Sequence, residues 1–426
     1  MAPLLAALRR RSAACAAGEQ AALLAALACA PPSSPSEGAS SASTATCWES
    51  DSGSSYASIP AEFYALCQSG ASREWGNLHT RVFRALTAPL LRLLIWLAMK
   101  QSVPTNCSML LMRVANQVFN APNANKDWVA RRFLRLVLPS EHAHMTAATP
   151  TLYARFRFAL FELPGVGIPG ILNFLDGRTQ WFDDRVTAAL DAGVTQVVVI
   201  AAGFDSTAYR LGRPGVTFFE VDLPKASARK RALLGAALPG ATAPARGAGA
   251  GKAAAAAAAL ATAAGARVEF VAADLATSPL AEALASSSSF DPSRPALFTA
   301  QGLLYYLPPR AVAGLLAGVR GIAAPGSRLA FDFMRLDCLS GRRLTGGLEV
   351  MRLGVAARGE PFLSALDDAP GCVEALGRSF GFRAVERFGA RQLAARFLPH
   401  LRFREFPAPV QPCFAFAEFA VDGGEQ

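Results

Sequence analysis

Residues 194–211 read VTQVVVIAAGFDSTAYRL, and this stretch decides the fold. Its first part, residues 196–201, is apolar and rich in valine after Gln196, which is the pattern of a strand buried on both faces of a sheet. Gly203 follows where such a strand must turn, and a glycine there lets a ligand approach the backbone. A strand, a glycine turn and a helix in this order are typical of a parallel α/β sheet that binds its ligand at the carboxyl ends of its strands.

The same alternation continues toward the end of the chain. Short apolar runs predict strands at residues 196–201, 216–221, 267–272, 296–300 and 328–333, with two more at 382–388 and 414–421. Longer stretches rich in alanine and leucine separate these runs and predict helices. We therefore expect an α/β fold, in which a seven-stranded, mostly parallel sheet has helices on both faces. Residues 235–265 are of low complexity and are expected to form a surface insertion.

Acidic residues end the next two predicted strands. Asp222 follows Gly203 by about 20 residues, the spacing at which a carboxylate accepts hydrogen bonds from both ribose hydroxyls of a nucleoside. Asp274 ends the following strand, where it can accept from an adenine amino group while Leu275 covers the ring. The turn lacks the Gly-x-Gly-x-x-Gly cradle for a pyrophosphate, which disfavours a nicotinamide-dependent oxidoreductase. S-adenosylmethionine, a nucleoside without a pyrophosphate, fits this pattern.

Six ordered blocks of sequence carry a family resemblance. They are GRTQWFDD (177–184), VTQVVVIAAGFDSTAYRL (194–211), FFEVDLPKASARKRALL (218–234), VAADL (271–275), FDPSRPALFTAQGLLYYLPP (290–309) and APGSRLAFDF (324–333). In these blocks the chain resembles the leucine carboxyl methyltransferase-like family of S-adenosylmethionine-dependent methyltransferases, including its bacterial members of unknown substrate. The resemblance covers roughly residues 172–421. It implies a class I methyltransferase fold, which is Rossmann-like, and S-adenosyl-L-methionine as the cofactor.

The resemblance also assigns cofactor-binding roles to single residues. It makes Arg178 the partner of the methionine carboxylate of the cofactor, a task that suits a guanidinium group. Gly203 would lie against the methionine part, Asp222 would bind the ribose, and Asp274 with Leu275 would bind the adenine. Asp205 corresponds to the aspartate that follows the turn in the family.

Two positions depart from the family pattern. Ala201 stands where the family usually has the first glycine of a Gly-x-Gly turn, and Gln301 replaces a glutamate that faces the amino group of the cofactor. Gln301 can still accept one hydrogen bond but loses the charge attraction, so cofactor binding weakens by about 1 kcal/mol. A weakened or inactive relative is therefore one of the alternatives.

The function we predict is that of an O-methyltransferase, which transfers methyl to a carboxylate or hydroxyl of a small molecule or protein. A carboxylate acceptor needs no general base, and the sequence identifies no catalytic residue. Tyr305, Tyr306 and Arg335, at or after the ends of two strands, are candidates for acceptor contacts. The alternative function is a cofactor-binding or membrane-associated protein on the same fold that has lost turnover.

The remainder of the chain, residues 1–171, has a different composition. The chain of 426 residues has a net charge of +10, and residues 73–135 supply ten basic against two acidic residues. We expect a basic helical cap at 59–171 before a methyltransferase domain at 172–426. Within the cap, apolar residues 86–99 predict either a buried helix or a basic amphipathic helix on an anionic membrane, which makes peripheral membrane contact an open alternative. Nucleic acid is not an expected partner, because aromatic and basic residues do not interleave.

Residues 1–58 are rich in alanine and serine, contain an early arginine cluster and have few acids. This composition fits either an organelle transit peptide, for a chloroplast or mitochondrion, or a low-complexity tail on a cytoplasmic protein. The eight cysteines are scattered without zinc-site spacing, so we expect free thiols in a reducing intracellular compartment and no metal site. The sequence does not predict the oligomeric state.

Overall fold

The computed structural model describes residues 59–60, 63–69, 82, 89, 104–119, 124–147, 149–164, 167–238, 260–262, 264–275, 278–287, 289–343, 345–402 and 408–422. Three predicted segments lie wholly or almost wholly outside this description. They are the N-terminal segment 1–58, the apolar segment 86–99 apart from Pro89, and residues 239–259 of the low-complexity insertion.

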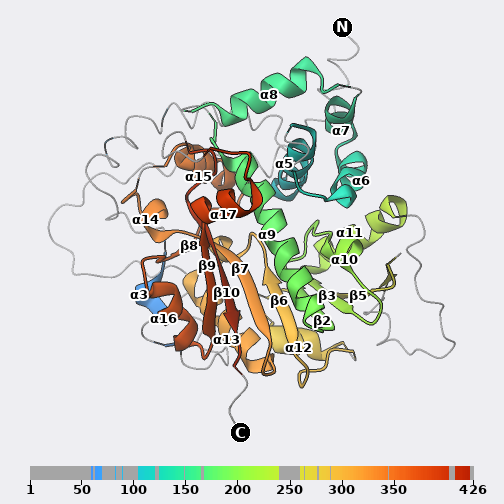
Figure 1. Cartoon of the computed structure of the whole chain (residues 1–426), viewed down its shortest axis with the longest axis vertical. Coiled ribbons are helices and arrows are strands. Elements are labelled where there is room, and N and C mark those ends of the chain that lie inside the picture. Colours follow the sequence, from blue (N-terminus) through green and yellow to red (C-terminus); the bar gives the residue numbers. More distant parts are fainter. Residues whose placement is uncertain are drawn as a thin grey trace, which may run out of the picture.

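The main sheet has eight strands in the order β4-β5-β3-β2-β6-β7-β10-β9 (Figure 1). Five central strands run parallel to one another: β5 (Arg267–Ala272), β3 (Thr217–Asp222), β2 (Gln196–Ile200), β6 (Ala296–Ala300) and β7 (Arg328–Met334). β10 (Phe414–Ala420) runs antiparallel to both β7 and β9 (Arg383–Gly389). The strand order reverses between β2 and β6, and ligands bind at such a point in open α/β sheets.

The predicted strands are confirmed to within two residues at either end. The sheet nevertheless has one strand more than the seven expected, because the two-residue β4 (Leu260–Ala261) adds an antiparallel edge to β5. A second sheet pairs β1 (Cys67–Ser69) with β8 (Ser364–Leu366). The sequence pattern did not predict β1, β4 or β8, because runs of two or three residues are too short to show a period.

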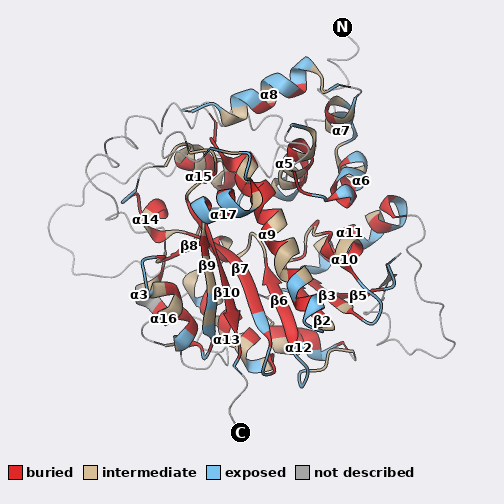
Figure 2. Ribbon diagram, in the orientation of Figure 1, coloured by how far each residue is buried: buried red, intermediate tan, exposed pale blue. Residues whose placement is uncertain are grey.

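Helices cover both faces of the sheet. One face carries α9 (Ile171–Asp191), α10 (Thr207–Leu211), α11 (Pro224–Ala237) and α17 (Ala390–Phe397), whereas the other carries α3 (Phe63–Leu66), α12 (Leu280–Ala285), α13 (Pro309–Ile322) and α16 (Cys372–Ser379). Each face has its own apolar cluster, and alternate residues of one strand enter different clusters: Val197 and Val199 join the first, Val198 and Ile200 the second. This period of two explains the unbroken apolar sequence of β2. Figure 2 shows the strands buried between the two layers.

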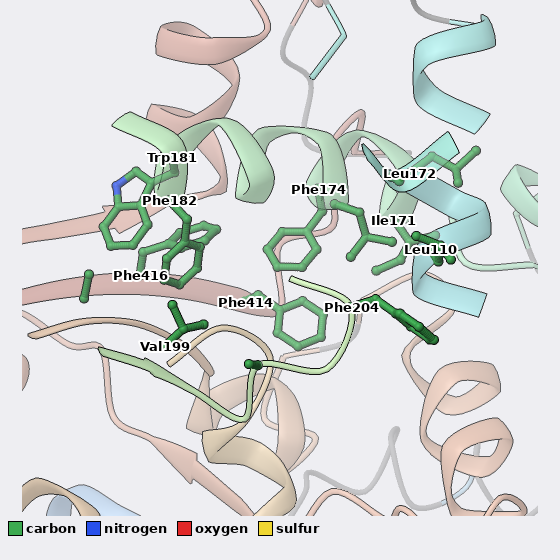
Figure 3. Packing of buried hydrophobic residues seen from close by; sticks show 14 of the residues in the cluster. Leu110, Ile171, Leu172, Phe174, Trp181, Phe182, Val199, Phe204, Phe414 and Phe416 are labelled. Carbon is green, nitrogen blue, oxygen red and sulfur yellow. The ribbon is translucent and has the colours of Figure 1, made fainter. Parts of the chain in front are cut away.

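The long helix α9 forms the centre of the first cluster (Figure 3). Its apolar residues recur every three or four positions, so they form one face of the helix. Phe174 stacks on Phe414 of β10 with ring centroids 4.5 Å apart, and Trp181 lies 4.9 Å from Phe416 of the same strand. These contacts fix α9 across the sheet, and they place Arg178, between the two aromatic positions, above the carboxyl ends of the strands.

The cap consists of α5 (Thr105–Phe119), α6 (Trp128–Val137), α7 (Pro139–Thr146) and α8 (Leu152–Glu162). Its buried residues, such as Leu110 and Val114, belong to the same cluster as α9, so the cap and the sheet share one core. The predicted boundary at 171–172 falls at the first turn of α9. No helix in the described part of the chain has the length and apolarity that a membrane crossing requires.

The remaining elements lie between strands: one follows β6, and two lie between β7 and β8. They are the 3-10 turn η2 (Leu304–Tyr306), α14 (Leu336–Leu339) and α15 (Leu348–Ala356). η2 follows β6 directly, and its backbone contacts the segment before β8, where the Leu363 N–H donates to the Tyr305 carbonyl at 2.7 Å. This contact holds η2 over the ends of β6 and β7.

Candidate functional site

The turn after β2 has an unusual backbone. Ala201 has a φ of 56°, and it is the only residue other than glycine with positive φ in the described ranges. Gly203 has a φ of 41°, and a Cβ atom there would meet nothing nearer than the Ala201 carbonyl oxygen at 3.9 Å. The turn therefore has the left-handed geometry of a Gly-x-Gly sequence, but one of the two positions carries a side chain. An L-residue in this conformation costs about 1–2 kcal/mol relative to the right-handed region.

Asp222 lies beside this turn at the end of β3. The parallel register pairs Ile200 with Val221, which brings the carboxyl ends of the two strands together. One carboxylate oxygen of Asp222 accepts the Gly203 N–H at 2.6 Å, and the other accepts the Leu223 N–H at 2.7 Å. Since each carboxylate oxygen has two acceptor directions, both retain capacity for another donor. The structure thus places Asp222, the residue predicted to bind the ribose, next to the predicted glycine turn.

Arg178 reaches the same end of the sheet from α9. It is 6% exposed, and its Nη1 atom lies 3.2 Å from the Tyr305 hydroxyl and 3.3 Å from Oδ2 of Asp332. Asp332, in the middle of β7, also accepts the Gly302 N–H at 2.5 Å. Burial raises the pKa of the Asp332 carboxyl, and Arg178 with the Gly302 N–H lowers it only in part. Asp332 thus positions Arg178, although sequence reasoning did not select it.

At this end of the sheet, two buried donors have no hydrogen-bond partner among the residues that the structure describes. They are Nε of Arg178 and Nε2 of Gln301, the residue directly after β6. A Cβ atom on Gly302, the residue after Gln301, would lie 3.1 Å from Nη1 of Arg178. The segment that carries Gln301 therefore lies next to the Arg178 side chain. Unpaired buried donors cost free energy, and a ligand with oxygen acceptors would satisfy them. The sequence selected both residues, and the structure places both at the strand ends.

The acceptor-side candidates have mostly structural partners. Tyr305 is buried among aromatic rings, 5.2 Å from Phe414 and 5.5 Å from Phe362 between centroids, and its hydroxyl contacts Arg178. Tyr306 is half-buried and lies 4.8 Å from the ring of Tyr305. Arg335, after β7, is ion-paired with Asp337 at 2.8 Å and with Asp368 at 3.2 Å. Its charge is therefore already compensated by two carboxylates.

The other predicted residues follow β2 and β5. Asp205 accepts the Thr207 N–H at 2.8 Å and the Thr207 hydroxyl at 3.2 Å, so it fixes the start of α10. The Asp274 carbonyl accepts the Ser278 N–H at 2.8 Å in the loop after β5. Leu275 is half-buried and packs on the second apolar cluster. β2 and β5 flank β3 in the sheet, so the loops that carry these three residues lie on either side of β3, which ends at Asp222.

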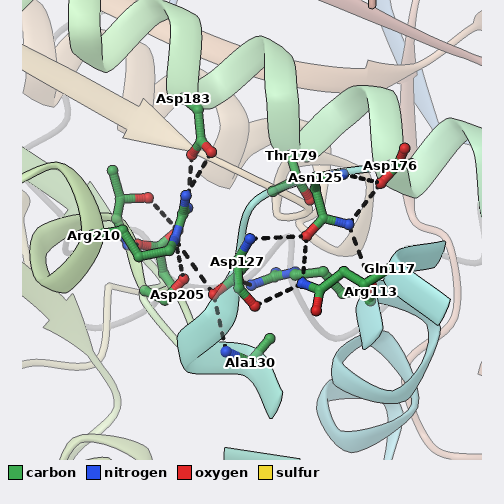
Figure 4. Close-up of polar contacts among 12 residues, drawn as sticks. Arg113, Gln117, Asn125, Asp127, Ala130, Asp176, Thr179, Asp183, Asp205 and Arg210 are labelled. Carbon is green, nitrogen blue, oxygen red and sulfur yellow. Dashed lines mark hydrogen bonds and ion pairs between the residues drawn. The ribbon is translucent and has the colours of Figure 1, made fainter. Parts of the chain in front are cut away.

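A buried ionic network joins this region to the cap (Figure 4). Arg210 of α10 makes two bonds to Asp183 of α9, at 2.6 and 2.7 Å, and lies 3.4 Å from Asp127. Asp127 is fully buried, accepts the Ala130 N–H at the start of α6, and pairs with Arg113 of α5 at 2.8 Å. Sequence reasoning missed this network. Its signal was the presence of Asp183 and Arg210 inside two of the quoted blocks.

Comparisons with known proteins place the chain in a family. The family model described as leucine carboxyl methyltransferase matches residues 107–320, half of the chain. The chain belongs to this family. A relative from Mycolicibacterium paratuberculosis is 38% identical over 162 residues, covering 38% of this chain and 46% of the relative. Another, from Mycobacterium leprae, is 36% identical over 199 residues, covering 45% of this chain and 55% of the relative. Both are provisionally named S-adenosyl-L-methionine-dependent methyltransferases.

The chain therefore spans about half the length of the curated relatives that it matches. Among solved structures, a DUF574 family protein from Streptomyces avermitilis is similar with a TM-score of 0.39 and 17% identity, over 59% of this chain and 86% of that chain. The family match includes the cap helices from α5 onward, which the sequence blocks quoted above did not reach.

Proposed function

We propose that the chain is an S-adenosylmethionine-dependent O-methyltransferase that transfers methyl to a carboxylate or hydroxyl of a small molecule or protein. One observation carries this proposal. Arg178 and Gln301 present buried donors that have no partner within the described ranges, at the same strand ends where Asp222 is held against the Gly203 turn. Family membership supports it, because the names of the relatives contain the same cofactor and activity.

The residues present fit the parts of this cofactor. Asp222 retains two acceptor directions for the ribose hydroxyls, and Arg178, fixed by Asp332, offers its guanidinium to the methionine carboxylate. The open space at Gly203 allows the methionine part of the cofactor to approach the protein backbone. Gln301 would contact the amino-acid end of the cofactor through its amide. In this binding mode the cofactor contacts both the strained turn after β2 and the donors of Arg178 and Gln301 that lack partners among the described residues.

S-adenosylmethionine supplies a methyl group bound to a sulfonium, which is lost by in-line displacement. The task of this chain is then to align the acceptor and exclude water. Burial raises the pKa of Tyr305 well above its ordinary value and also raises that of Tyr306, so both phenols stay protonated near neutral pH. Neither can therefore act as a general base. A carboxylate acceptor needs none, and we favour it over a hydroxyl for this reason.

A second function is favoured by the two departures from the family pattern. Ala201 holds a strained conformation, and Gln301 lacks the charge of a glutamate. A cofactor-binding protein without turnover, whether soluble or on a membrane, would tolerate both changes. It would bind S-adenosylmethionine and S-adenosylhomocysteine equally and release no product.

The experiment measures S-adenosylhomocysteine released from S-adenosylmethionine in the presence of small-molecule carboxylates, phenols and extract proteins. We expect release with at least one carboxylate acceptor and none with Arg178→Met. If mild base removes the methyl group from the product, the product is a methyl ester and the acceptor group is a carboxylate. Binding of both cofactor forms without release, across all acceptors, would support the second function and contradict the first.

A further inference from the structure

A cationic pocket lies on the cap side of the molecule. It has a volume of about 310 Å³, at the lower end of the range for small-ligand sites. α6 and α7 form one side and the last turn of α11 forms the other. The pocket is lined by Arg131, Arg132, Arg135, His142, Ala236 and Ala237. None of these described lining residues is acidic, and the two alanines leave room between the helices.

The three arginines lack the carboxylate partners that their neighbours have. In the same cap, Arg113 pairs with Asp127, and Arg157 pairs with Glu141. Within the described ranges, no ion pair involves Arg131, Arg132 or Arg135; Arg131 instead donates to the Gln117 amide oxygen at 2.7 Å. The positive charge of the pocket is therefore not compensated by any residue that the structure describes.

The surroundings of the pocket show the same uncompensated charge. Burial lowers the pKa of His142, and the positive charges of Arg135 and Arg131 lower it further. The C-terminal carbonyls of α11 would oppose an anion, but Arg132 donates to the Ala237 carbonyl at 3.1 Å and so offsets part of that dipole. Three guanidinium groups that face one concave space suit a ligand with several anionic oxygens.

This pocket is distinct from the cofactor region. α11 begins at Pro224, next to Asp222, and ends at Ala237, in the pocket. Its 14 residues span about 20 Å, so an occupant of the pocket lies about that far from the ribose-binding carboxylate. α6 nevertheless starts at Asp127, which contacts Arg210 beside the turn, so one helix links the two regions.

From this geometry we infer that the pocket between α6, α7 and α11 binds a phosphate-bearing ligand, separate from the methyl donor and acceptor. The ligand chemistry is a phosphate monoester or pyrophosphate group, carried either by a soluble molecule or by a lipid headgroup. Arg131 and Arg135 are the residues that bind it. Arg132 holds the end of α11 in place through its hydrogen bond to the Ala237 carbonyl. This inference does not depend on the activity proposed above.

The experiment uses the full chain and two probes. Inorganic pyrophosphate is titrated while the fluorescence of Trp128, 4.7 Å from the Arg132 guanidinium, is followed, and binding is checked by equilibrium dialysis. Sedimentation is measured with phosphatidylcholine vesicles, with and without phosphatidic acid. The variants are Arg131→Gln and Arg135→Gln, and the control is Arg310→Gln, an exposed arginine in the first turn of α13.

We expect saturable binding of one probe, weakened at least tenfold in each pocket variant and unchanged in the control. Binding of pyrophosphate indicates a soluble ligand, whereas binding only to vesicles with phosphatidic acid indicates a headgroup. Equal weakening in all three variants, or no binding of either probe by a folded wild type, overturns the inference. Within the described residues the Arg135 side chain makes no hydrogen bond or ion pair; burial lowers the pKa of His142, and the positive charge of Arg135 lowers it further. The melting temperature of Arg135→Gln should therefore match the wild type, and a matching value shows that a loss of binding does not come from unfolding.

Discussion

Removal of both members of the Arg178–Asp332 pair should destabilise the protein less than the sum of the two single removals. The two charged groups are 3.3 Å apart, with side chains 7% and 0% exposed. Coulomb's law with an effective dielectric constant of 20 gives about 5 kcal/mol for unit charges at this distance. Loss of one partner leaves the other buried and unpaired, so we expect Arg178→Met and Asp332→Asn each to lower the free energy of unfolding by about 3–5 kcal/mol.

The assay is a double-mutant cycle by urea denaturation at neutral pH. The double variant should be less destabilised than the sum of the singles by about 2 kcal/mol or more. The control is the same cycle on the exposed pair Arg383 and Asp422, 59% and 58% exposed, where the coupling should not exceed about 0.5 kcal/mol. Additive effects at the buried pair would refute the reasoning.

The cycle also has a pH signature. Burial raises the pKa of Asp332 above its ordinary value, and without Arg178 this pKa rises further. The folded form of Arg178→Met then takes up a proton more readily than the unfolded chain. Its destabilisation relative to the wild type should therefore shrink as pH falls from 8 toward 5, and a constant or growing difference would contradict the buried-charge explanation.

Three further predictions concern the turn and the network. Ala201→Gly relieves about 1–2 kcal/mol of backbone strain, less about 0.4–1 kcal/mol for the freer unfolded chain, so urea denaturation should show no loss and up to about 1.6 kcal/mol of gain. Gln301→Glu restores a charge for the cofactor ammonium and should tighten S-adenosylhomocysteine binding about fivefold by calorimetry. Burial acts to raise the pKa of Asp127, but Arg210 and Arg113 outweigh it and hold this pKa below 3.8. The stability that Asp127→Asn removes, about 2–4 kcal/mol, should be constant from pH 7 to about 4 and should vanish as pH falls further; a loss that is unchanged at pH 2 would exclude a charge effect.

The sequence was sufficient for the strands because their pattern is local. Each strand of the parallel core is buried on both faces, so it appears as an apolar run whose limits agree with the structure to within two residues. The position of Asp222 beside the glycine turn was also predictable, because neighbouring parallel strands bring their carboxyl ends together. Its role in binding ribose stays a prediction. Ala201 was recognised as a departure, and its positive φ shows what that departure costs.

Contacts between distant segments were not predictable in the same way. Asp332 lies within an apolar strand, and only the fold shows that it faces Arg178, 154 residues earlier. Arg210 meets Asp127 across the boundary between cap and sheet, where no period or spacing relates them. The cationic pocket likewise requires the end of α11 to meet α6. Such pairings depend on packing, for which a single sequence carries no periodic signal.

The most direct test of the cofactor site is a calorimetric titration of S-adenosylhomocysteine into the wild-type protein and into Asp222→Asn. The variant keeps one acceptor oxygen for the turn but loses the charge that two ribose hydroxyls would share. We predict saturable binding at one site per chain, weakened at least tenfold in the variant. Equal affinity of the two proteins, or no binding by a folded wild type, would contradict the account of this site.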